Sequence, residues 1–562
     1  MRKLFVLWLL TLAVAGYAKR TDNTFKVLCY HNVCDKITDT SMMNITTAQL
    51  IEHFKWLKAN NYHVIGIDDI LAAQKGVRSL PDNAVLLTFD DGYESFYTHV
   101  FPLLKLYGYH AVFALVGSWL DTPMDRRFLY GSLPKARSLL LTPEQIREMA
   151  RSPLVEFASH SYNAHYGITA NPQGNKEPFY TSLYFYPEAN RYENMTDYVT
   201  RVETDIRKSK EAVFRYAGYY PRVMVWPYGS YNGVVQTLAQ KYGMPVTMTL
   251  DDGVNTPADT GALKRILISS NPSFEEFSRA MIEPQEVEKH RALFIDPDDL
   301  YAKDSKEADR KLGLLIEKVH TMKVTTVVLK AYSDTDGDGF ADMLYFPNTQ
   351  LPLRADLLNR IVWQLKSRAG VDDIYVRMPL YTFEQNDRPM EIADEKSQQK
   401  IYRIYHELGA SAHFSGIVFD VAFNPQHISK PVIYHFANEA YKLLRDFSPH
   451  IVKSAALSYT DFMKGNIASL YDGFDNVVVY LDGRLDRDAF LRRVKRLEKG
   501  FEKTFVCVGL QKGEDLKTEE TLAFLLRNGF SSIALRLSLS TLYAKKSLEA
   551  LKLLSLQKSA LR

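Results

Sequence analysis

Short apolar runs alternate with amphipathic stretches along most of the chain. In the first half, the apolar runs have the length of β-strands and cover residues 26–30, 85–89, 111–116, 155–158, 223–225 and 245–250. Residues 47–59 have the spacing of an amphipathic helix instead. Strands that alternate with helices predict an α/β domain with a mainly parallel sheet, either barrel-like or wound. Functional side chains of such domains lie at the carboxyl ends of the strands.

The same alternation starts again after a charged stretch at residues 275–290. Its apolar runs cover residues 292–295, 325–329, 373–376, 416–419, 476–480, 504–508 and 532–535. Seven or so β/α units in this half predict a (β/α)8 barrel. The chain has 562 residues, too many for one ordinary core, so two domains are expected from length as well. We place the boundary near residue 280, with one domain at residues 19–280 and the other at residues 281–562.

Residues 1–18 have the pattern of a secretory signal. Two basic residues precede an apolar run at residues 4–15, and the small residues Gly16 and Ala18 follow it. The run is shorter than the ~20 residues that span a bilayer, so we expect removal of the segment and export to the periplasm; an uncleaved anchor is the alternative. No cysteine directly follows the small residues, so lipid anchoring at the outer membrane is not encoded there.

Charge and cysteine content narrow the class of protein. Lys+Arg 69 and Asp+Glu 66 leave a formal net charge of +3, without long runs of one sign, so no nucleic-acid partner is expected. Cys29, Cys34 and Cys507 are too few for a disulfide framework. Cys29 and Cys34 either form a disulfide in an oxidising compartment or lie as small buried apolar residues.

Asp90 and Asp91 follow the apolar run at residues 85–89 and precede Gly92. An Asp-Asp-Gly sequence alone is typical of a turn or a helix cap. At the end of a strand, however, the chain turns and both carboxylates can face one cleft.

His160 and His165 follow the next candidate strand end, at residues 155–158. Their spacing of five does not match the helical His-Glu-x-x-His pattern, so a loop at the strand end is expected to present them. With one aspartate they supply three ligands and leave positions open for water and substrate, as a catalytic divalent metal requires. Together with the aspartate pair, this favours a metal site over a pair of ordinary surface histidines.

Three motifs in this half resemble those of the polysaccharide deacetylases of carbohydrate esterase family 4. They are Thr88-Phe89-Asp90-Asp91-Gly92-Tyr93, His160-Ser161 followed by His165, and the early Tyr30-His31-Asn32-Val33. The early histidine motif is similar to the branch in which a motif that occurs late in other members comes first, as a circular permutation. The resemblance implies a (β/α)7-type deacetylase barrel with a divalent metal ion, Zn, Ni, Co or Fe.

The same resemblance implies a role for each residue of the motifs. Asp90 would be the general base, and Asp91, His160 and His165 would be the metal ligands. His31 would be the general acid that protonates the leaving amine, with a structural histidine at a strand end as the alternative. Imidazole suits this task because its ordinary pKa of about 6.5 lies close to neutrality.

Trp226-Pro227-Tyr228-Gly229 occupies the place of an arginine and proline motif in many members of this family. The usual arginine is missing, although the sequence is similar to that of the permuted branch. Trp226 and Tyr228 either line the sugar pocket or belong to the core.

The second half resembles the two-domain poly-β-1,6-N-acetyl-D-glucosamine deacetylases of Gram-negative bacteria. The residues that carry this resemblance lie at 324–327, 336–339, 344–348 and 353–357. It implies a periplasmic enzyme that removes some acetyl groups during export of a biofilm polysaccharide. Poly-N-acetylglucosamine and an outer-membrane exporter are the implied partners. The second domain would be a glycoside-hydrolase-like barrel that binds the deacetylated polymer and, in some members, cleaves it.

Carboxylates follow several candidate strands of the second half. Asp296, Asp298, Asp420 and Asp482 suit a cationic sugar or a glycosidase, and a turn or helix cap is the alternative for each. The family has a His-Asp-Asp cluster where this chain has Asp420-Val421-Ala422, which favours sugar binding over cleavage.

Two other functions remain open from the sequence. A peptidoglycan or chitin deacetylase would use the same chemistry, but these enzymes usually lack the second barrel. A non-catalytic polysaccharide-binding export protein would keep the fold without the site, yet the aspartate pair and both histidines are intact.

Overall fold

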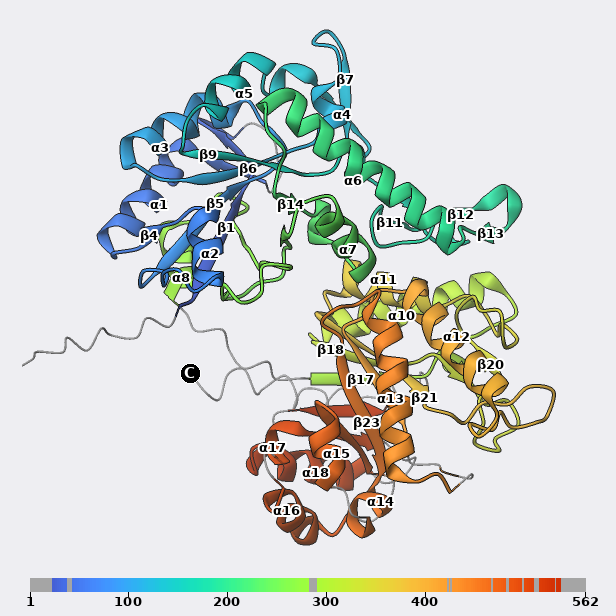
Figure 1. Ribbon diagram of the computed structural model, residues 1–562. Coiled ribbons are helices and arrows are strands. Elements are labelled where there is room, and N and C mark those ends of the chain that lie inside the picture. Colours follow the sequence, from blue (N-terminus) through green and yellow to red (C-terminus); the bar gives the residue numbers. More distant parts are fainter. Residues whose placement is uncertain are drawn as a thin grey trace, which may run out of the picture.

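The computed structural model describes residues 23–37, 43–282, 291–421, 424, 427–465, 468–481, 485–497, 500–509, 515–530 and 532–536. The expected signal at residues 1–18 and the candidate Asp482 lie outside the described residues. Two α/β domains follow one another along the chain (Figure 1). Among the described residues, the structure contains no helix with the length and apolarity that crossing a membrane requires.

The first domain contains a parallel sheet with a path of seven strands. Their order is β15 (Val246–Met248), β14 (Val223–Val225), β9 (Val155–Ser159), β6 (Ala111–Leu115), β5 (Ala84–Phe89), β1 (Phe25–Tyr30) and β16 (Ile266–Leu267), with β4 (His63–Val64) beside β5. Every residue of β5 is buried, as expected for a parallel strand covered on both faces. The α/β architecture expected of this half is confirmed.

Helices connect these strands and cover the sheet. They are α1 (Thr47–Ala59), α2 (Ile67–Gln74), α3 (Phe101–Tyr107), α5 (Pro143–Ala150), α6 (Met195–Ala217), α7 (Gly233–Lys241) and α8 (Phe274–Ile282). Helix α1 has the bounds that the sequence pattern predicts. It begins after Thr46, whose hydroxyl accepts the backbone N–H of Gln49, and it buries Leu50, Phe54 and Leu57 on one face.

The second domain is a closed parallel barrel of eight strands, which confirms the predicted (β/α)8 fold. The strands are β17 (Arg291–Ile295), β18 (Thr326–Lys330), β21 (Asp373–Pro379), β22 (Gly416–Asp420), β23 (Val452–Ser458), β24 (Asn476–Leu481), β25 (Thr504–Gly509) and β26 (Ile533–Arg536). Closure is direct, because β17 pairs with both β18 and β26. The surrounding helices include α10 (Ser305–Thr321), α11 (Leu358–Gln364), α12 (Glu395–Ser411), α13 (Lys430–Arg445), α16 (Arg487–Lys495) and α18 (Asp515–Arg527).

A long excursion of the first domain, residues 167–193, contacts the barrel. It contains β10 (Gly167–Thr169), β11 (Lys176–Pro178), β12 (Phe185–Tyr186) and β13 (Arg191–Tyr192), which lie beyond α6 in Figure 1. The side-chain amide of Asn171 donates to Asn359 Oδ1 at 2.7 Å, and Asn359 Nδ2 donates to Glu177 Oε2 at 3.2 Å. The Tyr192 hydroxyl donates to Asp356. These buried polar contacts fix the excursion against α11 and the segment before it.

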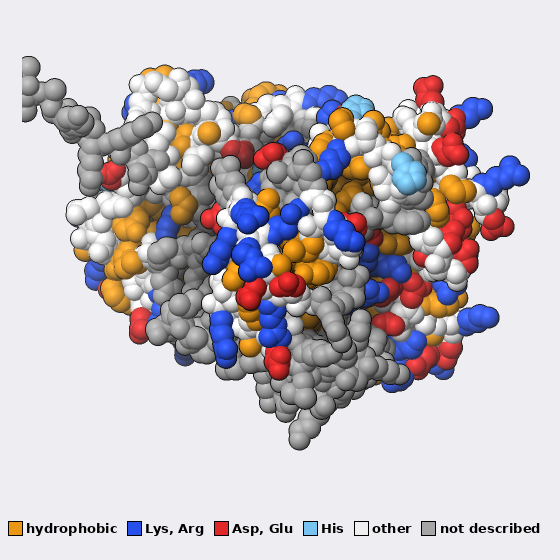
Figure 2. All heavy atoms as spheres, turned by 90° about the horizontal axis from the view of Figure 1, so that it is seen from below, with side chains coloured by type: hydrophobic (Ala, Val, Ile, Leu, Met, Phe, Trp, Pro, Cys, Tyr) orange, Lys and Arg blue, Asp and Glu red, His pale blue; other side chains and the backbone are white. Residues whose placement is uncertain are grey.

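The two signs of charge are mixed on the surface. On the face of the molecule seen from below, Lys, Arg, Asp and Glu side chains lie among one another (Figure 2). This agrees with a formal net charge of only +3.

Candidate active site

The strand register of the first domain brings the sequence motifs to one edge of the sheet. Tyr30 of β1 pairs with Phe89 of β5, so His31 and Asp90 follow neighbouring strands at the same level. Ser159 is the last residue of β9 and pairs with Leu115 of β6, which places His160 at the same edge. Carboxyl ends of parallel strands meet at one edge, where sites of this fold class lie.

Asp91, His160 and His165 form a compact buried cluster. The distance from Asp91 Oδ1 is 3.6 Å to His160 Nε2 and 3.4 Å to His165 Nε2. The other carboxylate oxygen, Oδ2, accepts a hydrogen bond of 3.0 Å from the hydroxyl of Tyr130. The structure therefore brings together the three residues that the sequence predicts as metal ligands.

Both imidazoles of this cluster are neutral at physiological pH. Burial lowers the pKa of His160 and of His165 to about 4. The Nδ1 atom of His160 lies 2.8 Å from the carbonyl oxygen of Val225, which can only accept, so Nδ1 carries the proton and Nε2 is a free lone pair. A neutral imidazole held in this way by a backbone carbonyl is the form that binds metals.

The donor set fits a divalent metal ion. Among the described residues, Asp91 Oδ1 is buried without a hydrogen-bond partner, and it faces the two Nε2 atoms. One carboxylate and two imidazoles are ligands of Zn²⁺, Ni²⁺, Co²⁺ and Fe²⁺, and three protein ligands leave positions open for water and substrate. A bound cation would satisfy this oxygen and offset the burial that raises the pKa of Asp91.

Asp90 lies beside this cluster but has a different partner. Nη1 of Arg265 lies 2.9 Å from each of its carboxylate oxygens, and both side chains are buried. Burial alone would raise the pKa of Asp90, but the Arg265 guanidinium and the nearby histidines outweigh it and lower the pKa to about 2. Asp90 is therefore ionised throughout the neutral range. The two adjacent aspartates thus differ in environment.

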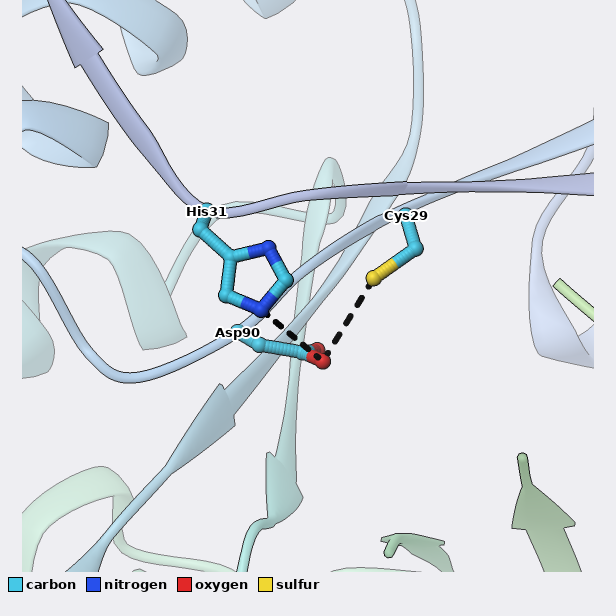
Figure 3. Close-up of side chains that lie close together, drawn as sticks. All are labelled: Cys29, His31 and Asp90. Atoms are coloured by element: carbon cyan, nitrogen blue, oxygen red, sulfur yellow. Dashed lines mark hydrogen bonds and ion pairs between the residues drawn. The ribbon is translucent and has the colours of Figure 1, made fainter. Parts of the chain in front are cut away.

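His31 and Cys29 approach Asp90 from the end of β1. His31 Nε2 lies 4.0 Å from Asp90 Oδ2, and the thiol of Cys29 donates to the same oxygen at 3.5 Å (Figure 3). Burial raises the pKa of Cys29 well above its usual value, so the thiol stays protonated and can donate. Cys29 and Cys34 form no disulfide, because Cys34 Sγ instead lies 3.7 Å from the carbonyl oxygen of Ile45.

Three non-glycine residues of the site have a left-handed backbone. Asp91 has a φ of 78°, Ser161 a φ of 80° and Tyr228 a φ of 59°. Such conformations cost about 1–3 kcal/mol each and persist where the surrounding structure holds them. The left-handed backbone of Asp91 turns the chain away from the direction of β5, so the side chains of Asp90 and Asp91 face different partners.

Trp226 and Tyr228 take different positions. Trp226 is fully buried and packs edge-on against Tyr180, so the prediction that Trp226 lines the sugar pocket is corrected in favour of a core position. Tyr228 is 44% exposed, and its ring centroid lies 4.7 Å from that of His165. Only Tyr228 of this pair can reach a substrate in this structure.

The carboxylates expected at the barrel mouth are paired with cations. Lys330 Nζ lies 3.1 Å from both Asp296 Oδ2 and Asp298 Oδ2, and Asp296 also caps α9 (Pro297–Leu300). Asp420, the last residue of β22, pairs with Arg377 and accepts a hydrogen bond from a tyrosine hydroxyl. The negative charge that could bind a cationic sugar at the carboxyl end of the barrel strands is therefore smaller than the sequence implies.

Sequence reasoning missed three residues of the site. Arg265 lies 175 positions from Asp90, immediately before β16, and no local motif marks it. Tyr130 reaches Asp91 from β7 (Arg127–Tyr130). Cys29 was expected either in a disulfide or as a small buried apolar residue, although its place two residues before His31 was a usable signal for the site.

In comparisons with known proteins, each half of the chain matches a family of its own. Residues 78–260 match the polysaccharide deacetylase family, and residues 294–397 match a family described as hypothetical glycosyl hydrolase family 13. The poly-β-1,6-N-acetyl-D-glucosamine N-deacetylase of Escherichia coli K12 is 37% identical over 419 residues, which are 71% of this chain and 62% of that protein. The chain thus spans less than two thirds of the length of this relative.

Two further relatives cover the first domain. A Staphylococcus epidermidis protein of the same description is 26% identical over 234 residues, 41% of this chain and 70% of that protein. A solved de-N-acetylase from Aggregatibacter actinomycetemcomitans is 38% identical and covers 46% of this chain and 99% of its own, with a TM-score of 0.44. With its aspartate pair, its histidine motif and the family match at residues 78–260, the chain contains a polysaccharide deacetylase domain.

Proposed function

We propose that the chain is a metal-dependent N-deacetylase of poly-β-1,6-N-acetyl-D-glucosamine that releases acetate and leaves free amines on the polymer. The observation that carries the proposal is that candidate metal ligands and a candidate general base lie next to each other at one edge of the sheet. Two neutral imidazoles and Asp91 converge there, and the ionised Asp90 lies beside them. The choice of polymer is supported by the description of the Escherichia coli relative.

Asp91, His160 and His165 would hold the metal ion. When bound there, a divalent cation acidifies a water molecule and polarises the acetamide carbonyl. Asp90 accepts the proton of the attacking water, and the buried guanidinium of Arg265 keeps the carboxylate charged and oriented for this step. Because the low pKa of Asp90 makes it a weak base, it depends on that acidified water.

His31 is placed to handle the leaving group. An amine leaves poorly until it is protonated, and a histidine can supply that proton near neutral pH. The His31 imidazole lies 4.0 Å from Asp90 Oδ2, so the candidate acid lies next to the candidate base. Burial of the cluster limits the access of bulk water and strengthens each of these interactions.

The barrel is proposed to bind the polymer rather than cleave it. The proton donor of a glycosidase has to be a protonated carboxylic acid. Asp420 instead forms an ion pair with Arg377, and the same carboxylate oxygen accepts a hydrogen bond from the Tyr332 hydroxyl, so it is engaged within the protein. Export, a periplasmic location and an outer-membrane exporter as partner belong to the same proposal, supported by the pattern of residues 1–18 and the resemblance of the second half.

Release of free amine from β-1,6-linked N-acetylglucosamine oligomers tests the proposed activity. With Zn²⁺, Ni²⁺, Co²⁺ or Fe²⁺ we expect release that a chelator abolishes, because Asp91, His160 and His165 would hold the metal ion that activates the water. Asp90→Asn should lower kcat by about 10²–10⁴-fold, the usual contribution of a general base. The exposed Asp82→Asn serves as the matched control with unchanged kcat.

Three outcomes would contradict parts of this proposal. Wild-type protein that releases no amine with any of the four metals rules out the activity and favours a non-catalytic binding protein. Equal release by Asp90→Asn removes that residue as the base. Faster release from chitin oligomers or peptidoglycan fragments than from β-1,6-linked oligomers assigns a different polymer.

A further inference from the structure

An acidic loop lies at the tip of a hairpin in the barrel domain, between β19 (Tyr332–Ser333) and β20 (Met343–Leu344). It covers residues 334–342 and follows the carboxyl end of β18. Asp334, Asp336 and Asp338 each place one carboxylate oxygen within 4.8 Å of the other two. We call residues 334–342 the acidic loop.

The spacing of the acidic loop follows the first part of the twelve-residue calcium loop. In that loop, side chains at positions 1, 3, 5 and 9 contribute to binding of the ion, and position 6 is a glycine at a sharp turn. The corresponding residues are Asp334, Asp336, Asp338 and Asp342, with Gly339 at position 6 and a φ of +96°. Position 12 supplies a bidentate glutamate in such loops but is Tyr345 here, so the acidic loop alone is incomplete.

Hydrogen bonds to the backbone explain only part of this arrangement. The carboxylate of Asp334 accepts the backbone N–H of Gly337 at 2.7 Å and that of Gly339 at 3.0 Å, as is usual in an acidic turn. Asp342 Oδ2 accepts the backbone N–H of Thr335 at 3.2 Å. Its other oxygen, Oδ1, is buried and has no hydrogen-bond partner among the described residues.

Glu384 brings a further carboxylate to the acidic loop from a distant segment. The backbone N–H of Ala341 donates to the carbonyl oxygen of Thr382 at 3.0 Å, and the N–H of Glu384 donates to that of Ala341 at 3.0 Å. Glu384 is only 7% exposed. In the part of the chain that the structure describes, its carboxylate has neither a hydrogen bond nor an ion pair. A buried carboxylate ordinarily has such a partner.

The charges around Glu384 are negative. Burial raises the pKa of Glu384, and the carboxylates of Asp338, Asp336, Asp342 and Asp387 raise it further. Over the described ranges, no lysine or arginine forms an ion pair with Glu384 or with an aspartate of the acidic loop. Carboxylates gathered in this way repel one another unless a cation lies among them.

We propose that the acidic loop and Glu384 bind one calcium ion, with Glu384 in the place of the glutamate that position 12 lacks. The side chains that converge here offer only oxygen atoms, and Ca²⁺ takes about six to eight oxygen ligands. Zn²⁺ and its neighbours favour nitrogen and sulfur, and Mg²⁺ keeps several water molecules instead of an all-protein shell. The site is separate from the deacetylase cluster and does not rest on the proposed function.

The ion would order the hairpin that contacts the mouth of the barrel. The Tyr332 hydroxyl donates to Asp420 Oδ2 at 3.2 Å, and the Ser333 hydroxyl donates to Asp298 Oδ1 at 2.8 Å. Both residues directly precede the acidic loop, so loss of the ion loosens these contacts. Calcium thus has a structural role, and its effect is on the stability of the barrel domain.

Calorimetric titration of the full chain with CaCl₂ tests the proposal. We expect one Ca²⁺ per chain with a Kd of about 10⁻⁵–10⁻³ M, and a higher midpoint of thermal unfolding when Ca²⁺ is present. Asp336→Asn and Glu384→Gln should each weaken the affinity by about tenfold or more, because affinity depends on the number of charged ligands. Asp91→Asn should bind Ca²⁺ as the wild type does, because Asp91 belongs to the other cluster.

Glu391→Gln is the matched control, because it removes an exposed carboxylate near Glu384 but outside the acidic loop, and its affinity should equal that of the wild type. Without Ca²⁺, Glu384→Gln should be at least as stable as the wild type, since it removes one of the repelling charges. This result separates loss of a ligand from misfolding. No binding at Ca²⁺ concentrations well above the expected Kd overturns the site, and unchanged affinity in Glu384→Gln overturns the role of Glu384. An equal response to Mg²⁺ overturns the choice of ion.

Discussion

At the scale of single residues, the pairing of Asp90 with Arg265 explains how two adjacent aspartates can do different work. Asp91 forms no ion pair with a lysine or an arginine among the described residues, and burial raises its pKa. Asp90 is held by a guanidinium, and its pKa falls to about 2. Arg265, which is distant in the sequence, thus gives Asp90 a different environment from that of Asp91, so one aspartate suits a base and the other a metal ligand.

Removal of this guanidinium should be costly for stability. Arg265→Met leaves the buried Asp90 carboxylate without its partner, and we expect a loss of about 3–5 kcal/mol in the free energy of unfolding. In a chain that already carries Asp90→Asn, the same change should cost clearly less, because no charge is left unpaired. Denaturant unfolding of the four proteins in this cycle measures the difference. An equal cost in both backgrounds would show that the pair is not coupled.

At the scale of elements, the loop after β14 depends on a close approach of two backbones. Gly229 has a φ of +68°, and a Cβ there would lie 2.5 Å from the backbone nitrogen of Leu250, after β15. This close approach fixes the neighbouring Tyr228 beside the candidate ligand His165.

Gly229→Ala should therefore both destabilise the first domain and displace Tyr228. Gly108→Ala is the matched control, because Gly108 has a φ of +66° but open space around its Cβ position. The control should lose about 1–2 kcal/mol of unfolding free energy, the general cost of a left-handed backbone. Gly229→Ala should lose more and also reduce kcat for amine release. Thermal unfolding and the deacetylation assay measure the two effects, and equal losses in both variants would contradict the clash.

At the scale of the whole molecule, two buried carboxyl groups lie where the domains meet. Burial raises the pKa of Glu177 to about 7 and that of Asp356 to about 6. Each has one oxygen without a hydrogen-bond partner among the described residues, as fits a group that is protonated in the fold. A carboxyl group with a raised pKa stabilises the fold at low pH, and this stability is lost as the pH rises.

Glu177→Gln should reduce the pH dependence of stability. In the wild type, Glu177 contributes stability that is present below about pH 4.5 and falls as the pH rises to about 7, by at most about 3 kcal/mol. The neutral glutamine cannot lose a proton, so the difference between urea unfolding at pH 5 and at pH 8 should shrink. The exposed Glu188→Gln, from the same excursion, should leave that difference unchanged. An unaltered difference in Glu177→Gln would contradict a buried, protonated carboxyl group.

The sequence by itself determined the architecture and four members of the candidate cluster. The apolar runs set the strands, and parallel strands bring whatever follows them to one edge, so Asp90, Asp91, His160 and His165 could be expected together. The barrel of the second half followed from the same periodicity. These features are local, because each depends on residues close together in the chain.

Only the tertiary structure decided which partner each side chain has. Arg265 reaches Asp90 across 175 positions, and Trp226 lies in the core although its motif suggested a sugar contact. The ion pairs at the barrel mouth likewise depend on packing between elements. Sequence patterns report the period of burial along a strand or helix. Charge, exposure and pKa are set instead by neighbours that the fold brings from distant parts of the chain.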